Sequence, residues 1–562
     1  MHNLSRTSSS EQRVVDGPTE EIHALLTADR WRNGLPAKIA QLEFRIRQAF
    51  GTTGPVGTLG PIEARRVLLS TRHLIEAELQ KVVARYSPYR WLWYLRRVPQ
   101  FVFKGAYRST SAYDATLAEC VSGRSGASST FRTAQDGGVG FRVKNDVVEV
   151  LIDYCLAIRA LSQIHSNLRW AGKSASINFN ESVLGAPEPT ADLERAVELY
   201  DLRSDDDGSF FRRVGTTATD ADGIGPDNIL SIERMTEQIG PLFYRPESKA
   251  TGRLCFAPTF LSLSTVGALN SDHRIRRQWW EPQLPSLAMF LRIALDLAFR
   301  SRLGFSIIQM LGYNLVERSE FLEAAQDHWN DACALAMRSF PDVVLPVSPE
   351  RLVDEMQQDQ GSLWPLRAGP PIRAAGELLC LDLYAATQQF QIKLQFPGET
   401  GEIANARADH FEEGVQLAVD NTHWRPSEHL RDFVGREIRC DGNTLTDIDA
   451  IGESNGSLLL LSCKSKIYSA EYDAGDFPVV RNQAEAVVEA VNHWKQLIEF
   501  VRARPVGDNY DFQRFNAIIG VVVLPHVVYV PLGQALDFVL DGLRAAVSAK
   551  ELTDWLNNQS GV

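Results

Sequence analysis

Four polar residues whose types suit phosphate chemistry flank one tight turn in the C-terminal third of the chain. Asp447 and Asp449 precede Asn455-Gly456, and Ser462 and Lys464 follow it. Asn-Gly favours a two-residue hairpin turn, because both central residues of that turn must tolerate a positive φ. The turn sets a register in which Asp449 lies opposite Ser462 and Asp447 lies opposite Lys464. Since opposed residues share one face of a sheet, the four side chains should form one patch, with β-carbons about 4.5–5.5 Å apart across the strands.

A patch of two carboxylates and a lysine carries the groups that phosphodiester hydrolysis needs. Carboxylates offer the hard oxygen ligands that Mg²⁺ prefers, and a neighbouring lysine can orient an attacking water or offset charge on a phosphate. The alternative is a salt bridge between Asp447 and Lys464 on a solvated sheet face, which contributes little to stability. The position of Lys464 favours chemistry, because it follows the run Leu458–Leu461. This run is typical of a strand buried on both faces, and such strands do not normally end in an unneeded ammonium group.

Three further elements must surround the hairpin to position its polar patch. The first is a helix whose apolar stripe consists of Phe411, Val415, Ala418 and Val419. On this helix Glu412 borders the stripe, whereas Glu413 points away from it. After the hairpin, the apolar spacing predicts a helix over residues 481–503, and a β-branched run predicts a buried strand over residues 515–524.

The order of these elements resembles the PD-(D/E)XK superfamily, the restriction-endonuclease-like nucleases, over residues 401–530. That family follows the order helix with a glutamate, strand, strand carrying Asp, strand ending in acid-x-Lys, helix, strand. By this resemblance, Asp449 matches the metal-binding aspartate and Lys464 the catalytic lysine. One position departs from the family pattern. The acidic residue, or sometimes Gln, that usually stands two residues before the lysine is Ser462 here, and a hydroxyl is a much poorer Mg²⁺ ligand than a carboxylate.

Two explanations of Ser462 remain open: the second carboxylate has moved, or the site has lost its metal. Asp447 and Glu412 are the candidates for a moved carboxylate, although Glu412 also fits an ordinary glutamate at the edge of an apolar stripe. Gln483 is a further candidate because related nucleases often carry a Gln on the second helix; the alternative is a surface amide.

The resemblance implies an endonuclease that depends on Mg²⁺ or Mn²⁺ and hydrolyses phosphodiester bonds in DNA. By this resemblance Asp449 is a metal ligand and Lys464 the catalytic lysine, and either Asp447 or Glu412 replaces the missing carboxylate as a second metal ligand. Ser462 and Gln483 complete the candidate catalytic set. Two alternatives belong to other classes of function. One is a catalytically degenerate nuclease fold that binds nucleic acid or a partner protein, and the other is a structural module whose hairpin patch is a salt bridge.

The whole chain is expected to be a multidomain protein, with a mostly α-helical N-terminal region and a C-terminal α/β restriction-endonuclease-like domain that has a mixed central sheet. The expected boundaries are a disordered tail at residues 1–23, a mainly helical region at 24–370 that could form two subdomains, a β-rich connecting segment at 371–400, the nuclease-like domain at 401–545, and a C-terminal helix and tail at 546–562. In the connecting segment, strands are expected at residues 378–384 and 390–396.

A basic and aromatic segment between Leu79 and Tyr113 is a second feature that could have a function, namely contact with nucleic acid. It contains basic residues and no acidic ones, interleaved with aromatic residues, and Arg90, Arg96, Arg97 and Lys104 are its candidates for nucleic-acid contact. Basic groups neutralise phosphates and aromatic rings stack on bases. The alternative is an amphipathic helix with core aromatic residues and solvated arginines.

Composition limits the classes of protein to which the chain can belong. Its 562 residues are 44% hydrophobic and 23% charged, as in ordinary globular proteins. With a net charge of −12, nucleic-acid binding must come from a local basic surface. Scattered cysteines without a Cys-x-x-Cys pair predict reduced thiols in the cytoplasm. The uncharged run at residues 515–536 contains Pro525 and Pro531, which argue against a membrane span. A homo-oligomer or a protein partner remains open.

Overall fold

The computed structural model describes parts of the N-terminal region and nearly all of the C-terminal region of the chain. The described residues are 29–51, 55–97, 145–207, 212–213, 256–257, 283–300, 313–339, 344–358, 369–375, 378–383, 385–386, 389, 401–466, 470–473 and 475–558. The expected strand at 390–396 lies outside them, as does the expected tail at 1–23.

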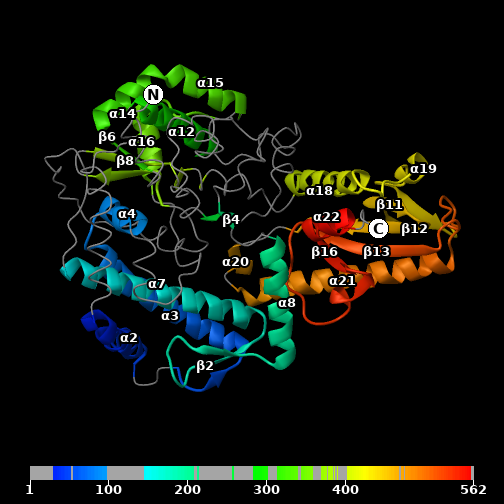
Figure 1. Cartoon of the computed structure of the whole chain (residues 1–562), viewed down its shortest axis with the longest axis horizontal. Coiled ribbons are helices and arrows are strands. Elements are labelled where there is room, and N and C mark those ends of the chain that lie inside the picture. The colour runs from blue at the N-terminus through cyan, green and yellow to red at the C-terminus, as the bar shows by residue number, and fades with distance from the viewer. Residues whose placement is uncertain are drawn as a thin grey trace, which may run out of the picture.

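The described N-terminal part is mainly helical, as its periodicity predicts (Figure 1). Its helices are α2 (Asp29–Phe50), α3 (Pro61–Val83), α4 (Pro88–Arg97), α7 (Asn145–Gly172), α8 (Ala191–Asp207), α12 (Gln283–Arg300), α14 (Arg318–Asp327), α15 (Trp329–Ser339) and α16 (Pro349–Gln357). Its strands are β1 (Thr58–Leu59), β2 (Ser176–Asn178), β3 (Ala186–Glu188), β4 (Arg212–Arg213), β5 (Phe256–Ala257), β6 (Tyr313–Glu317), β7 (Ile372–Ala375) and β8 (Leu378–Asp382).

Two separate apolar cores organise this region. In the first, α3 and α7 lie side by side and bury a stripe that includes Leu68 and Ile75 of α3. In the second, α12, α14 and α16 pack against a three-stranded sheet of order β6-β8-β7. The strand expected at 378–384 in the connecting segment therefore belongs, as β8, to this upstream sheet. The reason is a long-range pairing, Leu381 with Asn314, which local sequence does not reveal.

The C-terminal part contains a mixed sheet between helices. Its elements are α18 (Glu402–Asp420), α19 (Glu428–Arg431), β9 (Glu437–Cys440), β10 (Asn443–Asp447), β11 (Ala450–Ser454), β12 (Ser457–Cys463), α20 (Ala470–Asp473), α21 (Phe477–Ala503), β13 (Ala517–Leu524), η4 (Gln534–Leu536), β14 (Phe538–Leu540), β15 (Leu543–Arg544), β16 (Ala546–Ser548) and α22 (Ala549–Asn558). The helix expected at 481–503 thus begins at Phe477, and the strand expected at 515–524 begins at Ala517.

The central sheet has the strand order β11-β12-β13-β16. Strands β11 and β12 run antiparallel, whereas β12, β13 and β16 run parallel. Alternate residues of β12 enter different cores: Leu459 and Leu461 pack with α18 and α22, whereas Leu458 and Leu460 pack with α21. A strand buried on both faces explains the unbroken leucine run. In Figure 1, α18 and α21 accordingly lie on opposite sides of the sheet.

A side-chain amide closes the open edge of β11. The Gln416 carboxamide donates to the Ile451 carbonyl at 3.1 Å and accepts from the Ile451 amide at 2.8 Å. Gln416 is buried on α18, so this pair of hydrogen bonds fastens the helix to the edge strand. An exposed strand edge would otherwise present unpaired backbone groups.

Replacing Gln416 by Leu should destabilise the fold by about 2–4 kcal/mol, because it leaves the buried amide and carbonyl of Ile451 unpaired. Urea unfolding at equilibrium would measure this change. Glu413→Gln, on an exposed position of the same helix, is the control and should change the free energy of unfolding by less than about 0.5 kcal/mol. Equal stability of the two variants would contradict the edge-closing role.

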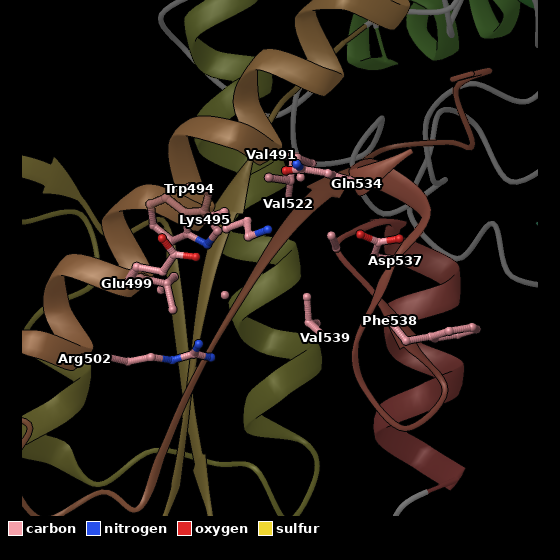
Figure 2. Close-up of a pocket in the computed structure, with 13 residues that line it drawn as sticks. Val491, Trp494, Lys495, Glu499, Arg502, Val522, Gln534, Asp537, Phe538 and Val539 are labelled. Carbon is pink, nitrogen blue, oxygen red and sulfur yellow. The ribbon is translucent and has the colours of Figure 1, made fainter. Parts of the chain in front are cut away.

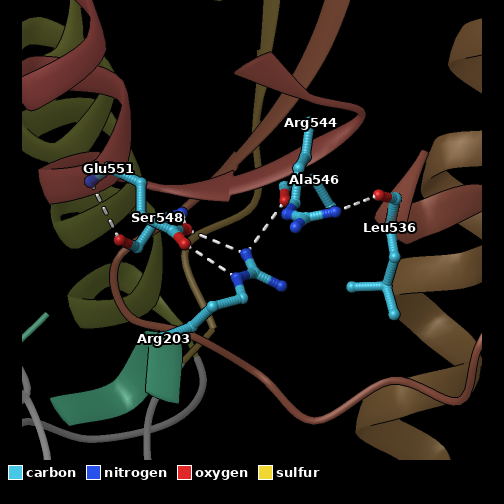
Figure 3. A network of polar contacts seen from close by, with 6 residues as sticks. All are labelled: Arg203, Leu536, Arg544, Ala546, Ser548 and Glu551. Carbon is cyan, nitrogen blue, oxygen red and sulfur yellow. Dashed lines mark hydrogen bonds and ion pairs between the residues drawn. The ribbon is translucent and has the colours of Figure 1, made fainter. Parts of the chain in front are cut away.

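Helix α8 docks on the C-terminal part, although the 194 residues between Asp207 and Glu402 separate the two in the chain. The Arg203 guanidinium binds the Glu551 carboxylate at 2.7 and 2.8 Å and donates to the Ala546 carbonyl at 3.1 Å (Figure 3). Nearby, Tyr200 of α8 packs edge-on against Tyr529, with ring centroids 6.0 Å apart. The expected boundaries therefore need correction: α8 contacts the C-terminal part of the chain, and β16 and α22 belong to the sheet and core of that part.

Helix α7 also approaches this part of the chain, through a glycine contact. A β-carbon added to Gly475 would lie 2.2 Å from the Leu168 carbonyl oxygen of α7. Gly475 also has a φ of +68°, which glycine adopts without strain. Close by, the Arg65 guanidinium of α3 contacts the Asp476 carboxylate at 2.5 Å. The N-terminal helices thus hold the segment that follows Lys464 in the sequence.

Candidate active site

The hairpin that carries the candidate site has the predicted turn and register. Asn455 and Gly456 have φ values of +47° and +75°, and Ser454 pairs with Ser457. The ladder reaches Ala450 opposite Leu461, so Asp449 and Ser462 come next in register. Asp449 is buried, and its Oδ2 accepts a 2.6 Å hydrogen bond from the Cys463 amide. Ser462 also donates its hydroxyl to the Asp449 carboxylate.

Asp447 does not join this ladder, which corrects the prediction that it lies directly opposite Lys464. It ends β10 and pairs with Glu437 of β9 in a separate two-stranded sheet. The change of sheet occurs at Ile448, whose amide donates to the Arg436 carbonyl and whose carbonyl accepts from the Gly435 amide. These long-range bonds bend the chain between the two aspartates. The negative charge of Asp447 still raises the pKa of Asp449 and of Glu412.

Lys464 stands at the end of β12 with its side chain exposed. Its amide donates to the Val523 carbonyl at 2.9 Å, which fixes the backbone against β13. Within the described part of the chain, its ammonium group forms no ion pair, so the expected alternative of an Asp447–Lys464 salt bridge is not observed. Its positive charge nevertheless lowers the pKa of both Asp449 and Glu412. The lysine thus lies near two carboxylates without being bound to either.

Glu412 reaches the same site from α18. It lines a cleft of about 490 Å³ together with Asp449, and Asp409, Gln416 and Arg431 contribute to the same walls. Burial raises the pKa of Glu412 to about 7, and the Asp449 charge adds to this increase. Burial also raises the pKa of Asp449, against the opposing effect of the Cys463 hydrogen bond. Two carboxylates from distant elements therefore face one cleft, where each destabilises the ionised form of its neighbour.

The raised pKa of Glu412 predicts a stability that falls with rising pH. From its ordinary value of 4.5 up to about 7, the folded protein holds a proton on Glu412 that the unfolded chain has released. Glu412→Gln should therefore gain stability relative to the wild type by about 1–2 kcal/mol between pH 5 and pH 8, after discounting for solvent screening. Urea unfolding in EDTA at both pH values would measure it. A pH-independent difference would contradict the raised pKa.

The residues in the cleft fit a hard divalent cation held mainly by water and substrate. Mg²⁺ usually binds through one or two carboxylates and keeps several waters. Asp449 and Glu412 supply that number, and a bound cation would relieve the repulsion between them. Among the described residues, no group of three or more His, Cys, Asp or Glu side chains is gathered closely enough to hold a metal on protein ligands alone. Ser462 donates its hydroxyl to the Asp449 carboxylate and contributes no carboxylate of its own to a metal site.

Gln483 lies in the early part of α21, partly buried, and is not among the residues that line the cleft. Its suggested role in catalysis stays a prediction. Sequence reasoning missed Arg407, whose guanidinium contacts Ser465 directly after Lys464. Arg407 precedes Phe411 and Val415 by four and eight residues, so it continues the apolar stripe of α18. A charged residue on an apolar stripe was the available signal.

The basic and aromatic segment has its described aromatic rings in the N-terminal core. Tyr89, Trp91 and Tyr94 are 0% exposed, and Trp91 stacks on Tyr154 with centroids 4.5 Å apart. These rings cannot stack on bases. The Arg90 guanidinium lies 3.8 Å from the centroid of the Tyr86 ring. The side chains of Arg96 and Arg97, and all of Lys104, lie outside the described residues, so their nucleic-acid contacts stay a prediction.

A second cavity, of about 240 Å³, lies between α21 and the segment that contains η4 and β14. Figure 2 shows Lys495, Glu499 and Arg502 entering it from α21, with Asp537 and Phe538 on the other side. Its floor includes Trp494, whose indole donates to the Leu460 carbonyl at 3.3 Å. Because this cavity lies on the α21 side of the sheet and mixes both signs of charge, it is separate from the carboxylate cleft on the α18 side.

Among the described residues, Cys155, Cys333, Cys380, Cys440 and Cys463 are free thiols. No described helix has the length and apolar character needed to cross a membrane. In comparisons with known proteins, no family model, curated protein or solved structure matches the chain.

Proposed function

We propose that the chain is a nuclease that depends on Mg²⁺ or Mn²⁺ and hydrolyses phosphodiester bonds in DNA, and that residues from about 401 onward form a restriction-endonuclease-like domain. One observation carries the proposal: Asp449 and Glu412, which come from different elements, line one cleft close to Lys464, whose ammonium group forms no ion pair with any described residue. Two carboxylates and a free lysine are the minimal equipment for metal-assisted attack of water on a phosphodiester.

The element order supports the proposal. Helix α18 carries Glu412, β9 and β10 follow, Asp449 precedes β11, β12 ends before Lys464, and α21 leads to β13. The parallel pairing of β12 with β13 places the residues after both strands at one edge of the sheet. Because a fold alone does not establish an activity, the proposal depends mainly on the residues that line the cleft.

Each residue has a distinct role in the proposal. Asp449 and Glu412 would hold the cation, which when bound polarises the phosphate and lowers the pKa of a coordinated water. Cys463 and Ser462 hold the Asp449 carboxylate in place through their hydrogen bonds. Lys464 would position the attacking water and stabilise charge on the phosphate oxygens. Asp447 adds negative charge that favours cation entry, without lying in the same strand ladder.

A degenerate nuclease fold that binds nucleic acid or a partner protein is the second candidate. Ser462 favours it, because the usual acidic residue is missing from the strand and the site depends on Glu412 for its second carboxylate. The two candidates differ in whether the wild-type protein turns over DNA.

A cleavage assay separates these functions. Supercoiled plasmid, single-stranded DNA and RNA of matched length would each be incubated with the full chain in Mg²⁺, in Mn²⁺ and in EDTA. The nuclease proposal expects metal-dependent nicking or linearisation of DNA that Asp449→Asn abolishes. Binding measured by fluorescence anisotropy, without cleavage in either metal, would select the degenerate fold. If the protein neither binds nor cleaves any of these nucleic acids, both nucleic-acid functions are refuted, and the chain is a structural module.

A further inference from the structure

The chain turns sharply at the point where it leaves β12 beyond Lys464. The Lys466 amide donates to the Lys464 carbonyl at 2.7 Å, which makes a three-residue turn with Ser465 at its centre. On the other side of Lys464, its own amide is bound to the Val523 carbonyl at 2.9 Å. The direction in which the Lys464 side chain leaves the backbone is therefore set by the sheet on one side and by this turn on the other.

Arg407 holds the centre of the turn. Its Nε donates to the Ser465 hydroxyl at 3.0 Å and its Nη2 donates to the Ser465 carbonyl at 3.3 Å. Arg407 is only 5% exposed, and a buried guanidinium is costly unless its donors are bonded. Its rigid fork fixes geometry better than a flexible lysine can. Two donors on one residue restrain both the position and the orientation of that residue.

The same helix carries a proposed metal ligand. Arg407 and Glu412 are both in α18, so the Arg407–Ser465 contact links the helix that presents the carboxylate to the strand end that presents the lysine. We propose that Arg407 is a positioning residue for Lys464, which sets the lysine relative to the Glu412–Asp449 cleft without touching the substrate. This inference rests on the proposed nuclease function. A misplacement of about 1 Å at a reacting group can cost about a hundredfold in rate.

Arg407→Met is the principal test, with Arg203→Met as the matched control. Both arginines are buried and donate to a backbone carbonyl in the C-terminal part, but Arg203 contacts Ala546 of β16, which β13 separates from the strand that ends just before Lys464. Arg407→Met should lower kcat for DNA cleavage about tenfold to a hundredfold, with KM changed by less than about threefold. Arg203→Met should lower Tm while leaving kcat per folded molecule unchanged. Arg407→Lys should recover only part of the loss, because an ammonium group lacks the fork.

A double-mutant cycle identifies the residue through which Arg407 acts. If Arg407 works through Lys464, adding Arg407→Met to Lys464→Ala should reduce the residual rate by less than about twofold. A full additional loss of tenfold or more would overturn the proposal, as would an unchanged kcat in the single variant.

Hydrogen exchange tests the same contact without any activity. In the wild type, the Lys464 and Lys466 amides are hydrogen-bonded and should exchange slowly. Arg407→Met should accelerate their exchange at least tenfold relative to the other β12 amides, whereas Arg203→Met should not. Unchanged exchange would overturn the positioning role. A wild-type protein that cuts no nucleic acid would refute the proposed function, and accelerated exchange would then show that Arg407 holds the turn but positions no catalytic group.

Discussion

Lys464→Ala is expected to lower the rate of DNA cleavage about a hundredfold to a thousandfold while leaving DNA affinity within about threefold. The loss is large because the ammonium group acts on charge that develops in the transition state. The affinity barely changes because one lysine supplies only one of many phosphate contacts. Cleavage would be measured under single-turnover conditions in Mg²⁺, and binding by fluorescence anisotropy in Ca²⁺.

Lys466→Ala is the matched control for this prediction. Lys466 lies two residues further along the same segment, is exposed and carries the same charge. It should retain the wild-type rate within about threefold, since a general phosphate contact contributes equally to ground state and transition state. If the two variants lose cleavage rate equally, both lysines only attract DNA, and Lys464 has no catalytic role.

Moving a carboxylate between two elements is expected to remove and then restore activity. Glu412→Gln should reduce cleavage at least about a hundredfold, equivalent to about 2.7 kcal/mol of transition-state stabilisation, because the cleft keeps only one carboxylate for the cation. Adding Ser462→Glu supplies a new carboxylate beside Asp449 and should recover at least about tenfold. In the wild-type background, Ser462→Glu should instead lower activity, since a third negative charge is crowded into the site.

The placement of the new charge decides the interpretation. Ser457→Glu, at the opposite end of β12, adds the same charge away from the cleft and should not rescue Glu412→Gln. Rescue by both substitutions would indicate a general effect of net charge. Full activity of Glu412→Gln would show that Glu412 is an ordinary helix residue, and Asp449 would then need another partner.

Local chemistry predicted the hairpin well. Asn455 and Gly456 specify the turn by themselves, and the register of β11 with β12 follows from it up to Ala450. The prediction failed at Asp447 because the register was extended past the end of the strand. The bend there depends on Arg436 and Gly435, which bind Ile448 from another segment.

Other parts of the site were only partly visible in the sequence. The helical spacing placed Glu412 at the edge of an apolar stripe, and the structure places it at the cleft with Asp449. Periodicity could not supply the partner of Arg407, since Ser465 is 58 residues away. Likewise, local sequence could not identify the partner of Arg203 in α8, since Glu551 is 348 residues away.

The docking of α8 limits how the C-terminal part can be exchanged between genes by recombination. Helix α8 covers an aromatic and aliphatic patch formed by Tyr472, Val480, Val527 and Tyr529. A gene segment that encoded only residues 401–562 would leave this patch in water, and Glu551 would lose its ion pair with Arg203. Such a segment is not expected to be a self-contained domain. Recombination that transplants the C-terminal part into another protein must carry α8 along or replace its apolar face, so the two parts of the chain are expected to evolve together.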